Sequence, residues 1–192
     1  MSDIFQKLTP KQPLFPFVGI KIFRFFNTKQ AGIFMNPNES VIHKFYRAFQ
    51  KKDYRTMIEC YHPEIHFHDE VFNLRGKAAG AMWHMLCERG ADLSLDYGAV
   101  KADDNNGSAH WEASYTFSVT NRKVLNKIDA QFEFRDGKII VHRDRFDFWK
   151  WSRMALGTPG IFLGWSPMLR KKVSATANKG LQKFISDHPE YL

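Results

Sequence analysis

The most constraining feature of this sequence is a series of segments in which apolar and polar residues alternate, a pattern typical of half-buried strands. The segments follow one another closely, at about residues 92–102, 109–119, 124–135 and 138–149. The connections "TNRK" and "RDGK" between the later segments are short and turn-like. Connections of this kind indicate antiparallel hairpins, so we expect a meander of four strands.

Helical patterns precede this meander. Apolar residues at helical spacing predict helices at about residues 40–51, 53–60 and 77–88, and a strand is expected after Pro63. Asn38 or Ser40 could cap the first helix, and Asp53 the second. Helices followed by a series of strands predict an α+β fold, in which helices pack on one face of a curved antiparallel sheet. Further helices are expected near residues 151–156 and 167–186, separated by an irregular break, "LGTPGIFLGW".

The positive charge of the chain lies in its two flanks. The net charge is +8; residues 1–37 carry five Lys/Arg and one acid, and residues 150–192 carry seven Lys/Arg and two acids. We therefore predict an aromatic and basic arm over residues 1–37, a nearly neutral domain over 38–149, and a basic helical extension over 150–192. Either the flanks dock on a membrane surface or a protein partner, or they pack back onto the domain and cover its open edge.

Other features exclude several classes of protein. No nucleic-acid-reading motif is present and the central domain is not basic, so we expect no nucleic-acid partner. The two cysteines, Cys60 and Cys87, form neither a disulfide framework nor a zinc pattern, which favours a reducing cytosol. The apolar segment Leu14–Ile20 is too short to span a bilayer. We expect a cytoplasmic protein whose contact with membranes, if any, is peripheral.

Alternation also predicts which strand residues point inward. One face is apolar and aromatic, with Trp111 and Tyr115 on the second strand of the meander, and the opposite face is largely charged. Asn126, His142 and Asp144 are polar exceptions on the apolar face. Because burying an unpaired polar group costs about 2–7 kcal/mol, these residues need partners, water or a ligand. Two interpretations remain open: a satisfied polar network at the end of the sheet, or a cavity that orients a small molecule.

The stretch "IHFHDEVF" poses a similar choice. Ile65 and Phe67 mark the inward face, so Asp69 is expected to point to the interior, whereas His66 and His68 point away. A His-x-His pair can bind zinc or iron, but it needs a third ligand that no motif positions here. We expect no metal and no cofactor.

Residues 38–149 resemble the SnoaL-like branch of the nuclear-transport-factor-2-like superfamily, which includes ketosteroid isomerases and polyketide cyclases. The matching segments are "FYRAFQKKDYRTMIECYHPEIHFHDEVFNLRG", "WEASYTF" and "FEFRDGKIIVHRDRF". The resemblance implies a cone of curved antiparallel sheet closed by three helices, with a pocket at the open end. It also implies a small apolar ligand of polyketide or steroid type, and we expect a homodimer through the sheet.

The resemblance implies that Asp69 corresponds to the aspartate that acts as the general base in the ketosteroid isomerases. The tyrosine of their oxyanion hole would fall on Phe45, with Tyr46 on a different helix face, and their protonated acid would fall on Ala130. Both oxyanion donors are therefore replaced by apolar residues. Cyclase-like relatives also carry their acid/base aspartate on that strand.

His142 and Asp144 remain as candidate catalytic residues. We predict an acid-base site of His142, Asp144 and Asp69, because histidine titrates near neutral pH, with a ligand held by Trp83, Trp111, Tyr115 and Asn126. The reaction class would be a lyase, isomerase or cyclase that moves a proton next to a carbonyl. The alternative is a non-catalytic binding or interaction module built on the same cone.

Overall fold

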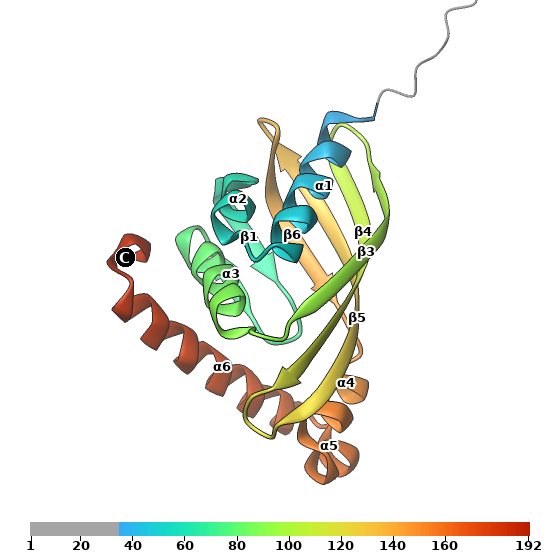
Figure 1. Ribbon diagram of the computed structural model, residues 1–192, viewed down its shortest axis with the longest axis vertical. Helices are drawn as coiled ribbons and strands as arrows, with labels where there is room; N and C mark the ends of the chain where they lie inside the picture. The colour runs from blue at the N-terminus through green and yellow to red at the C-terminus, as the bar shows by residue number, and fades with distance from the viewer. Residues whose placement is uncertain (1–34) are drawn as a thin grey trace, which may run out of the picture. The chain divides into compact units, whose positions relative to one another are not determined.

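The computed structural model describes residues 35–192, in which a six-stranded sheet curves around three helices (Figure 1). The predicted arm over residues 1–37 lies almost entirely outside the described residues. Residues 35–192 belong to one compact unit. The predicted α+β cone is confirmed.

The three helices of the cone are α1 (Pro37–Gln50), α2 (Tyr54–Glu59) and α3 (Lys77–Arg89). Helix α1 begins earlier than predicted, because the side chain of Asn36 accepts a hydrogen bond from the backbone N–H of Asn38 and Pro37 occupies the first turn. Asp53 caps α2 as expected, by accepting from the backbone N–H of Thr56.

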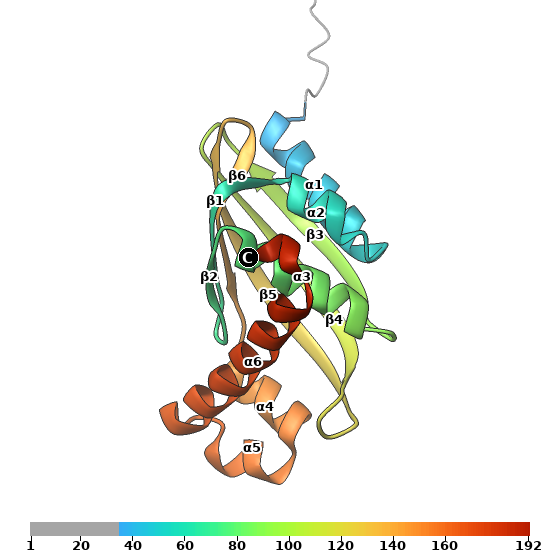
Figure 2. The ribbon, with the colours of Figure 1, turned by 90° about the vertical axis from the view of Figure 1, so that its left-hand side faces the viewer.

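The strands are β1 (Tyr61–His68), β2 (Asn73–Arg75), β3 (Ser94–Ala102), β4 (Asn106–Phe117), β5 (Arg122–Arg135) and β6 (Lys138–Arg145). Their order in the sheet is β2-β1-β6-β5-β4-β3. Strand β1 therefore lies in the same sheet as the meander (Figures 1 and 2), and it runs parallel to β6 whereas the other neighbours are antiparallel. The parallel pair is feasible because α3 and four strands, β2 to β5, lie between β1 and β6 in the chain. Sequence reasoning missed the short edge strand β2.

A bulge in β6 changes one predicted face. Glu133 pairs with Val141, and the next residue of β5, Phe134, pairs with Ile139, so Ile140 is an extra residue between two pairs. As a result Ile139 is fully buried, whereas strict alternation counted back from His142 predicts that Ile140 points inward. After the bulge, inward and outward residues alternate as predicted, and His142 and Asp144 face the core.

The core fills the concave side of the sheet beneath α1 and α3. Its largest fully buried side chains are Phe45, Tyr46, Phe67, Trp83 and Phe132. Several aromatic rings meet edge-to-face, for example Phe45 and Phe67 each with Trp83, with ring centroids 5.4 Å apart in both pairs. His142, one of the polar exceptions of the inward face, is surrounded by aromatic rings.

The C-terminal extension packs back onto the cone (Figure 2). It comprises α4 (Phe148–Leu156), α5 (Thr158–Leu163), α6 (Pro167–Asp187) and the 3-10 helix η1 (Pro189–Tyr191). Helix α6 buries Leu181, Phe184 and Ile185 and contacts α3. It also holds the β1–β2 loop: Arg170 lies 2.7 Å from a carboxylate oxygen of Glu70, and the Ser174 hydroxyl donates to the carbonyl of Val71.

The segment predicted as an irregular break contains α5. A Cβ atom at Gly160 would lie 1.9 Å from the backbone oxygen of Ser152, so only glycine allows α5 to approach α4 this closely. The Ser152 hydroxyl also donates to the carbonyl of Gly160. No helix among residues 35–192 is both long enough and apolar enough to cross a bilayer.

Candidate functional site

His142 is the centre of a buried polar chain inside the cone. It has no exposed surface, and both of its ring nitrogens have partners. Nδ1 lies 2.7 Å from the hydroxyl of Tyr61, and Nε2 lies 3.1 Å from Oδ1 of Asp144. Asp144, two residues along the same strand, is itself only 4% exposed. Of the two interpretations left open by the sequence, a satisfied polar network describes the surroundings of His142.

The donor and acceptor of each hydrogen bond in this series of side chains can be assigned. The indole Nε1–H of Trp83 can only donate, and it donates to the Tyr61 oxygen over 2.7 Å. The Tyr61 hydroxyl hydrogen is then free to donate to Nδ1 of His142, so Nε2 carries the ring hydrogen and donates to Asp144. The chain therefore runs from Trp83 through Tyr61 and His142 and ends on a carboxylate.

Asp144 accepts a hydrogen bond from a second donor. The indole N–H of Trp111 donates to the same Oδ1 atom over 3.2 Å. In the sheet register, Asp144 on β6 pairs with Ala130 on β5. Ala130 is the position at which the family resemblance places a carboxylic acid. The structure supplies a carboxylate from the neighbouring strand, directly across from that position.

Tyr46 is the exception in this interior. Its side chain is fully buried, yet its hydroxyl has no hydrogen-bond partner among the described residues. Its ring stacks on Tyr97, with centroids 5.0 Å apart, and lies 6.1 Å from the ring of Trp111. Burial raises the pKa of Tyr46 well above its usual value, and the negative charge of Asp144 adds to this rise. The unpartnered hydroxyl and Asp144 therefore share one region of the interior.

Asp69 lies just beyond the end of β1, in the turn to β2. Its Oδ1 accepts hydrogen bonds from the backbone N–H groups of Val71 and Phe72, so part of its role is to hold this turn. Burial raises the pKa of Asp69 to about 7; these two donors oppose the rise, and Asp144 and Glu70 add to it. Its charge in turn contributes to the raised pKa of Tyr115, of which burial is the main cause. Asp69 thus interacts electrostatically with Asp144 and Tyr115.

The four residues predicted to hold a ligand divide into two groups. Trp83 and Trp111 are buried and donate into the His142 chain. Tyr115 is partly buried, and its hydroxyl accepts from the indole N–H of Trp151 on α4 over 2.8 Å. Asn126 is partly buried opposite Ala113. The structure joins the two tryptophans to His142 and Asp144; Tyr115 lies at the side covered by α4.

Sequence reasoning missed Tyr61 and the orientation of Tyr46. Tyr61 has the same strand parity as Ile65 and Phe67, and that signal could have placed it inside. On α1 the fully buried residues are Ile42, Phe45 and Tyr46, with Phe49 2% exposed. Their i, i+3, i+4, i+7 spacing defines the inward face, so Tyr46 belongs to it and was wrongly assigned to another face.

Two surface hollows, of about 550 Å³ and about 270 Å³, lie elsewhere on the sheet. Both border Lys101, Ser108 and Gln131, and neither is lined by His142 or Asp144. His142 and Asp144 are buried, so the core encloses this hydrogen-bonded network.

Comparison with known proteins supports the family suggested by the sequence. No curated protein sequence matches the chain. An NTF2-like protein of unknown function from Burkholderia pseudomallei K96243 has 15% identity and a TM-score of 0.55, over 63% of this chain and 98% of that one. TerC, co-crystallised with polyporic acid, has 15% identity and a TM-score of 0.54, over 63% and 99%. An LEH-like epoxide hydrolase from M. tuberculosis has 16% identity and a TM-score of 0.50, over 69% and 95%.

These structures share the fold at low identity. The decisive match is that of the family model described as SnoaL-like domain, which covers residues 42–142 and so more than half of the chain. The matched region begins on α1 and ends at His142 on β6, and it includes Tyr46, Tyr61, Asp69, Trp83 and Trp111. The chain belongs to the SnoaL-like domain family, on the nuclear-transport-factor-2-like fold.

Proposed function

We propose that this protein binds a small, largely apolar molecule inside the cone and that the Tyr46 hydroxyl donates a hydrogen bond to an oxygen of that molecule. The observation that carries this proposal is that this fully buried hydroxyl has no hydrogen-bond partner among residues 35–192. Leaving such a group unsatisfied costs about 1–3 kcal/mol, whereas its neighbours Trp83, Tyr61 and His142 are fully paired. A ligand carbonyl or hydroxyl oxygen would remove this cost.

The surroundings of Tyr46 suit an aromatic or polycyclic ligand. The hydroxyl lies among the rings of Tyr97, Trp111 and Phe132, and sites for such molecules combine apolar walls with a few polar groups. Two fold neighbours are consistent with this class: one was co-crystallised with polyporic acid and another is an LEH-like epoxide hydrolase. Because the interior is closed, binding requires a covering element to move. We propose that this element is the β1–β2 loop, which carries Asp69 and is held by α6.

If the bound molecule reacts, Asp144 is the group that would take a proton from it. Both ring nitrogens of His142 are occupied, so His142 orients Asp144 and stabilises its charge and does not contact the ligand. This differs from the sequence prediction, in which His142 was the acid/base. Asp69, with its pKa raised to about 7, would be the second group able to exchange a proton near neutral pH. Proton transfer next to a carbonyl, as in an isomerase, lyase or cyclase, is the reaction class that these two carboxylates support.

Ligand binding should depend on the Tyr46 hydroxyl. We expect saturable quenching of tryptophan fluorescence when full-length protein is titrated with polyporic acid or a hydroxyanthraquinone, because Trp83 and Trp111 line the interior. Tyr46→Phe should weaken binding about tenfold, the value of one hydrogen bond. Tyr97→Phe is the matched control, since its hydroxyl is paired with His43 at 3.1 Å and should not contact the ligand. Equal affinities for wild type and Tyr46→Phe, or no saturable binding of either probe, would contradict the proposal.

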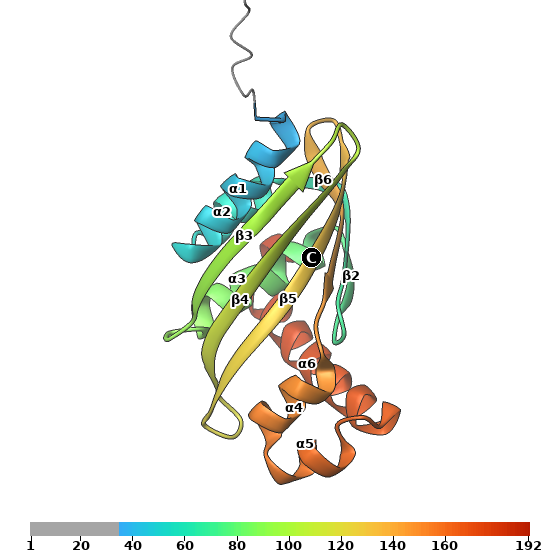
Figure 3. The same ribbon diagram turned by 90° about the vertical axis from the view of Figure 1, so that its right-hand side faces the viewer.

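A second function is favoured by a separate observation, an apolar patch on the C-terminal extension. We propose that this extension docks on an anionic membrane surface. Trp165, Phe162 and Met168 are 71%, 68% and 67% exposed, and Ile161, Leu163 and Trp149 are also exposed beside them. Figure 3 shows α4 and α5 at one end of the sheet, beyond the β4–β5 hairpin. We call these six residues the α5 patch.

The charge around the α5 patch matches such a surface. Residues 150–186 contain seven Lys/Arg and no acidic residue. Exposed Trp and Phe combined with basic side chains are typical of segments that lie in the membrane interface. Helix α6 packs back onto the cone, which was one of the two alternatives predicted from the sequence, but the described residues do not cover the α5 patch.

The expected homodimer through the sheet stays a prediction.

Removing the α5 patch should abolish membrane binding without affecting the cone. Phe162→Ser with Trp165→Ser should reduce binding to phosphatidylserine-containing vesicles at least about tenfold, because two large apolar side chains no longer insert. Leu125→Ser is the matched control, since Leu125 is exposed on β5 outside the patch. Wild-type binding should fall as salt rises, because the Debye length is only about 10 Å at 0.1 M. Equal co-sedimentation of wild type and the double variant would contradict this role.

A further inference from the structure

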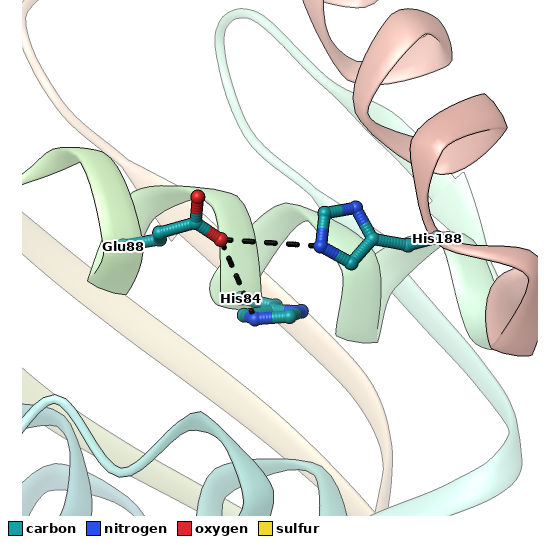
Figure 4. Close-up of side chains that lie close together, drawn as sticks. All are labelled: His84, Glu88 and His188. Atoms are coloured by element: carbon teal, nitrogen blue, oxygen red, sulfur yellow. Dashed lines mark ion pairs between the residues drawn. The ribbon is translucent and has the colours of Figure 1, made fainter.

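Two histidines and a glutamate converge where α3 meets the end of α6. His84 and Glu88 lie one turn apart on α3, and His188 follows the last residue of α6. The distance from Glu88 Oε2 to His84 Nε2 is 3.6 Å, and to His188 Nε2 it is 4.0 Å. One ligand atom from each side chain lies within 4.8 Å of the others (Figure 4). Among residues 35–192 this is the group of three that meets this criterion.

The Nδ1 atoms of both histidines, which point away from Glu88, already have hydrogen-bond partners. Nδ1 of His188 lies 2.8 Å from the carbonyl of Phe184, which can only accept, so Nδ1 carries the hydrogen and Nε2 presents a lone pair. Nδ1 of His84 lies 3.1 Å from the Tyr191 hydroxyl, and its ring stacks on Tyr54 with centroids 3.6 Å apart. Histidines that bind metals almost always have the other ring nitrogen fixed by a carbonyl, carboxylate or water. Here the two Nε2 atoms face Glu88.

We propose that His84, Glu88 and His188 bind a zinc ion or a similar transition-metal dication, with one coordination position left for water. Two imidazoles and one carboxylate are ligands that zinc uses at sites with an open position. Zinc lies about 2.0–2.2 Å from such atoms, which places ligand atoms about 3.3–3.5 Å apart in a tetrahedral site. The distances from Glu88 Oε2 to the two histidine nitrogens, 3.6 Å and 4.0 Å, are close to this spacing.

The charges around this group also suit a metal ion. Glu88 brings the negative charge that a dication requires, and its 56% exposed side chain leaves a path for the ion to enter.

A bound ion would attach the C-terminal segment to the cone. His188 and Tyr191 come from the end of the chain and His84 from the family domain, so the metal would fix η1 and the end of α6 against α3. This site differs from the histidines that suggested a metal in the sequence. Nε2 of His66 lies 2.6 Å from the side-chain oxygen of Asn73, and His68 is exposed. The expectation of no metal considered only that pair, because 104 residues separate His84 from His188.

The proposal is tested with full-length protein freed of metal by a chelator and then titrated with zinc. We expect one zinc per chain, and with cobalt(II) the visible absorption bands of a four-coordinate site. His188→Ala should weaken zinc binding at least about 100-fold and Glu88→Gln at least about tenfold, while circular dichroism stays that of wild type because both side chains are partly exposed. The double variant His66→Ala, His68→Ala should bind zinc as wild type does. Zinc binding unchanged by His188→Ala, binding lost in the His66, His68 double variant, or no stoichiometric binding would overturn the assignment.

Discussion

His142→Leu should lower the free energy of unfolding by about 3–5 kcal/mol, although leucine fits an apolar core. The reason is the pair of groups that the substitution leaves behind. Asp144 loses its Nε2–H donor, and the Tyr61 hydroxyl loses its acceptor, while both remain buried. Urea denaturation followed by circular dichroism measures the change.

A double variant separates lost packing from lost pairing. His142→Leu combined with Asp144→Leu removes the stranded carboxylate, and replacing both members of a buried polar pair is often nearly neutral. We therefore expect the double variant to recover part of the stability that His142→Leu loses, because the buried charge is gone while the Tyr61 hydroxyl and the Trp111 indole N–H still lack acceptors. If the two substitutions destabilise additively, the chain that ends on Asp144 does not have the energetic role assigned to it.

Stability should also fall as pH rises from about 4 to about 7, because of Asp69. Burial raises its pKa in the folded protein from 3.8 to about 7. A raised pKa means that the folded state holds the proton more tightly than the unfolded state. The contribution of protonated Asp69 to the free energy of unfolding is therefore fully present below pH 3.8 and is lost as pH rises through about 7. The Asp69 side chain is partly exposed, so solvent screening limits the loss to on the order of 2–3 kcal/mol.

Asp69→Asn isolates this contribution. Its side-chain oxygen can still accept from the N–H groups of Val71 and Phe72, so the turn is kept while the titration is removed. The difference in unfolding free energy between wild type and variant should change steadily between pH 4 and pH 7. A difference that is constant over this interval would show that Asp69 titrates at its ordinary pKa.

Most of the fold could be predicted from the sequence because strand parity and short turns are local signals. The meander, the three helices of the cone and the inward orientation of His142 and Asp144 all followed from spacing. The burial of Ile139 in place of Ile140 could not be predicted. It results from a bulge, which depends on how two strands pair and cannot be recognised from the sequence pattern of one strand. The short strand β2 has only three residues, too few to show a period.

The candidate site was predicted less completely, since its contacts join distant residues. Parity placed His142 inside but could not show that both its nitrogens are paired, because one partner, Tyr61, is 81 residues away. For the same reason Asp144 could not be matched to Ala130 across the sheet, nor His84 to His188. Composition indicated an apolar and basic C-terminal extension, whereas only packing shows that α6 is partly covered and the α5 patch is not.

The Tyr46 hydroxyl is proposed to donate a hydrogen bond to a ligand, and the stability of Tyr46→Phe tests this most directly. Unfolding free energies of wild type and variant should be compared without ligand and with saturating polyporic acid. Without ligand, Tyr46→Phe should be as stable as wild type or more stable by about 1–3 kcal/mol, because an unsatisfied buried hydroxyl is removed. With ligand, the order should reverse, because only wild type gains the new hydrogen bond. A variant that is less stable without ligand, and equally stabilised by it, would show that the hydroxyl has a structural partner and no role in binding.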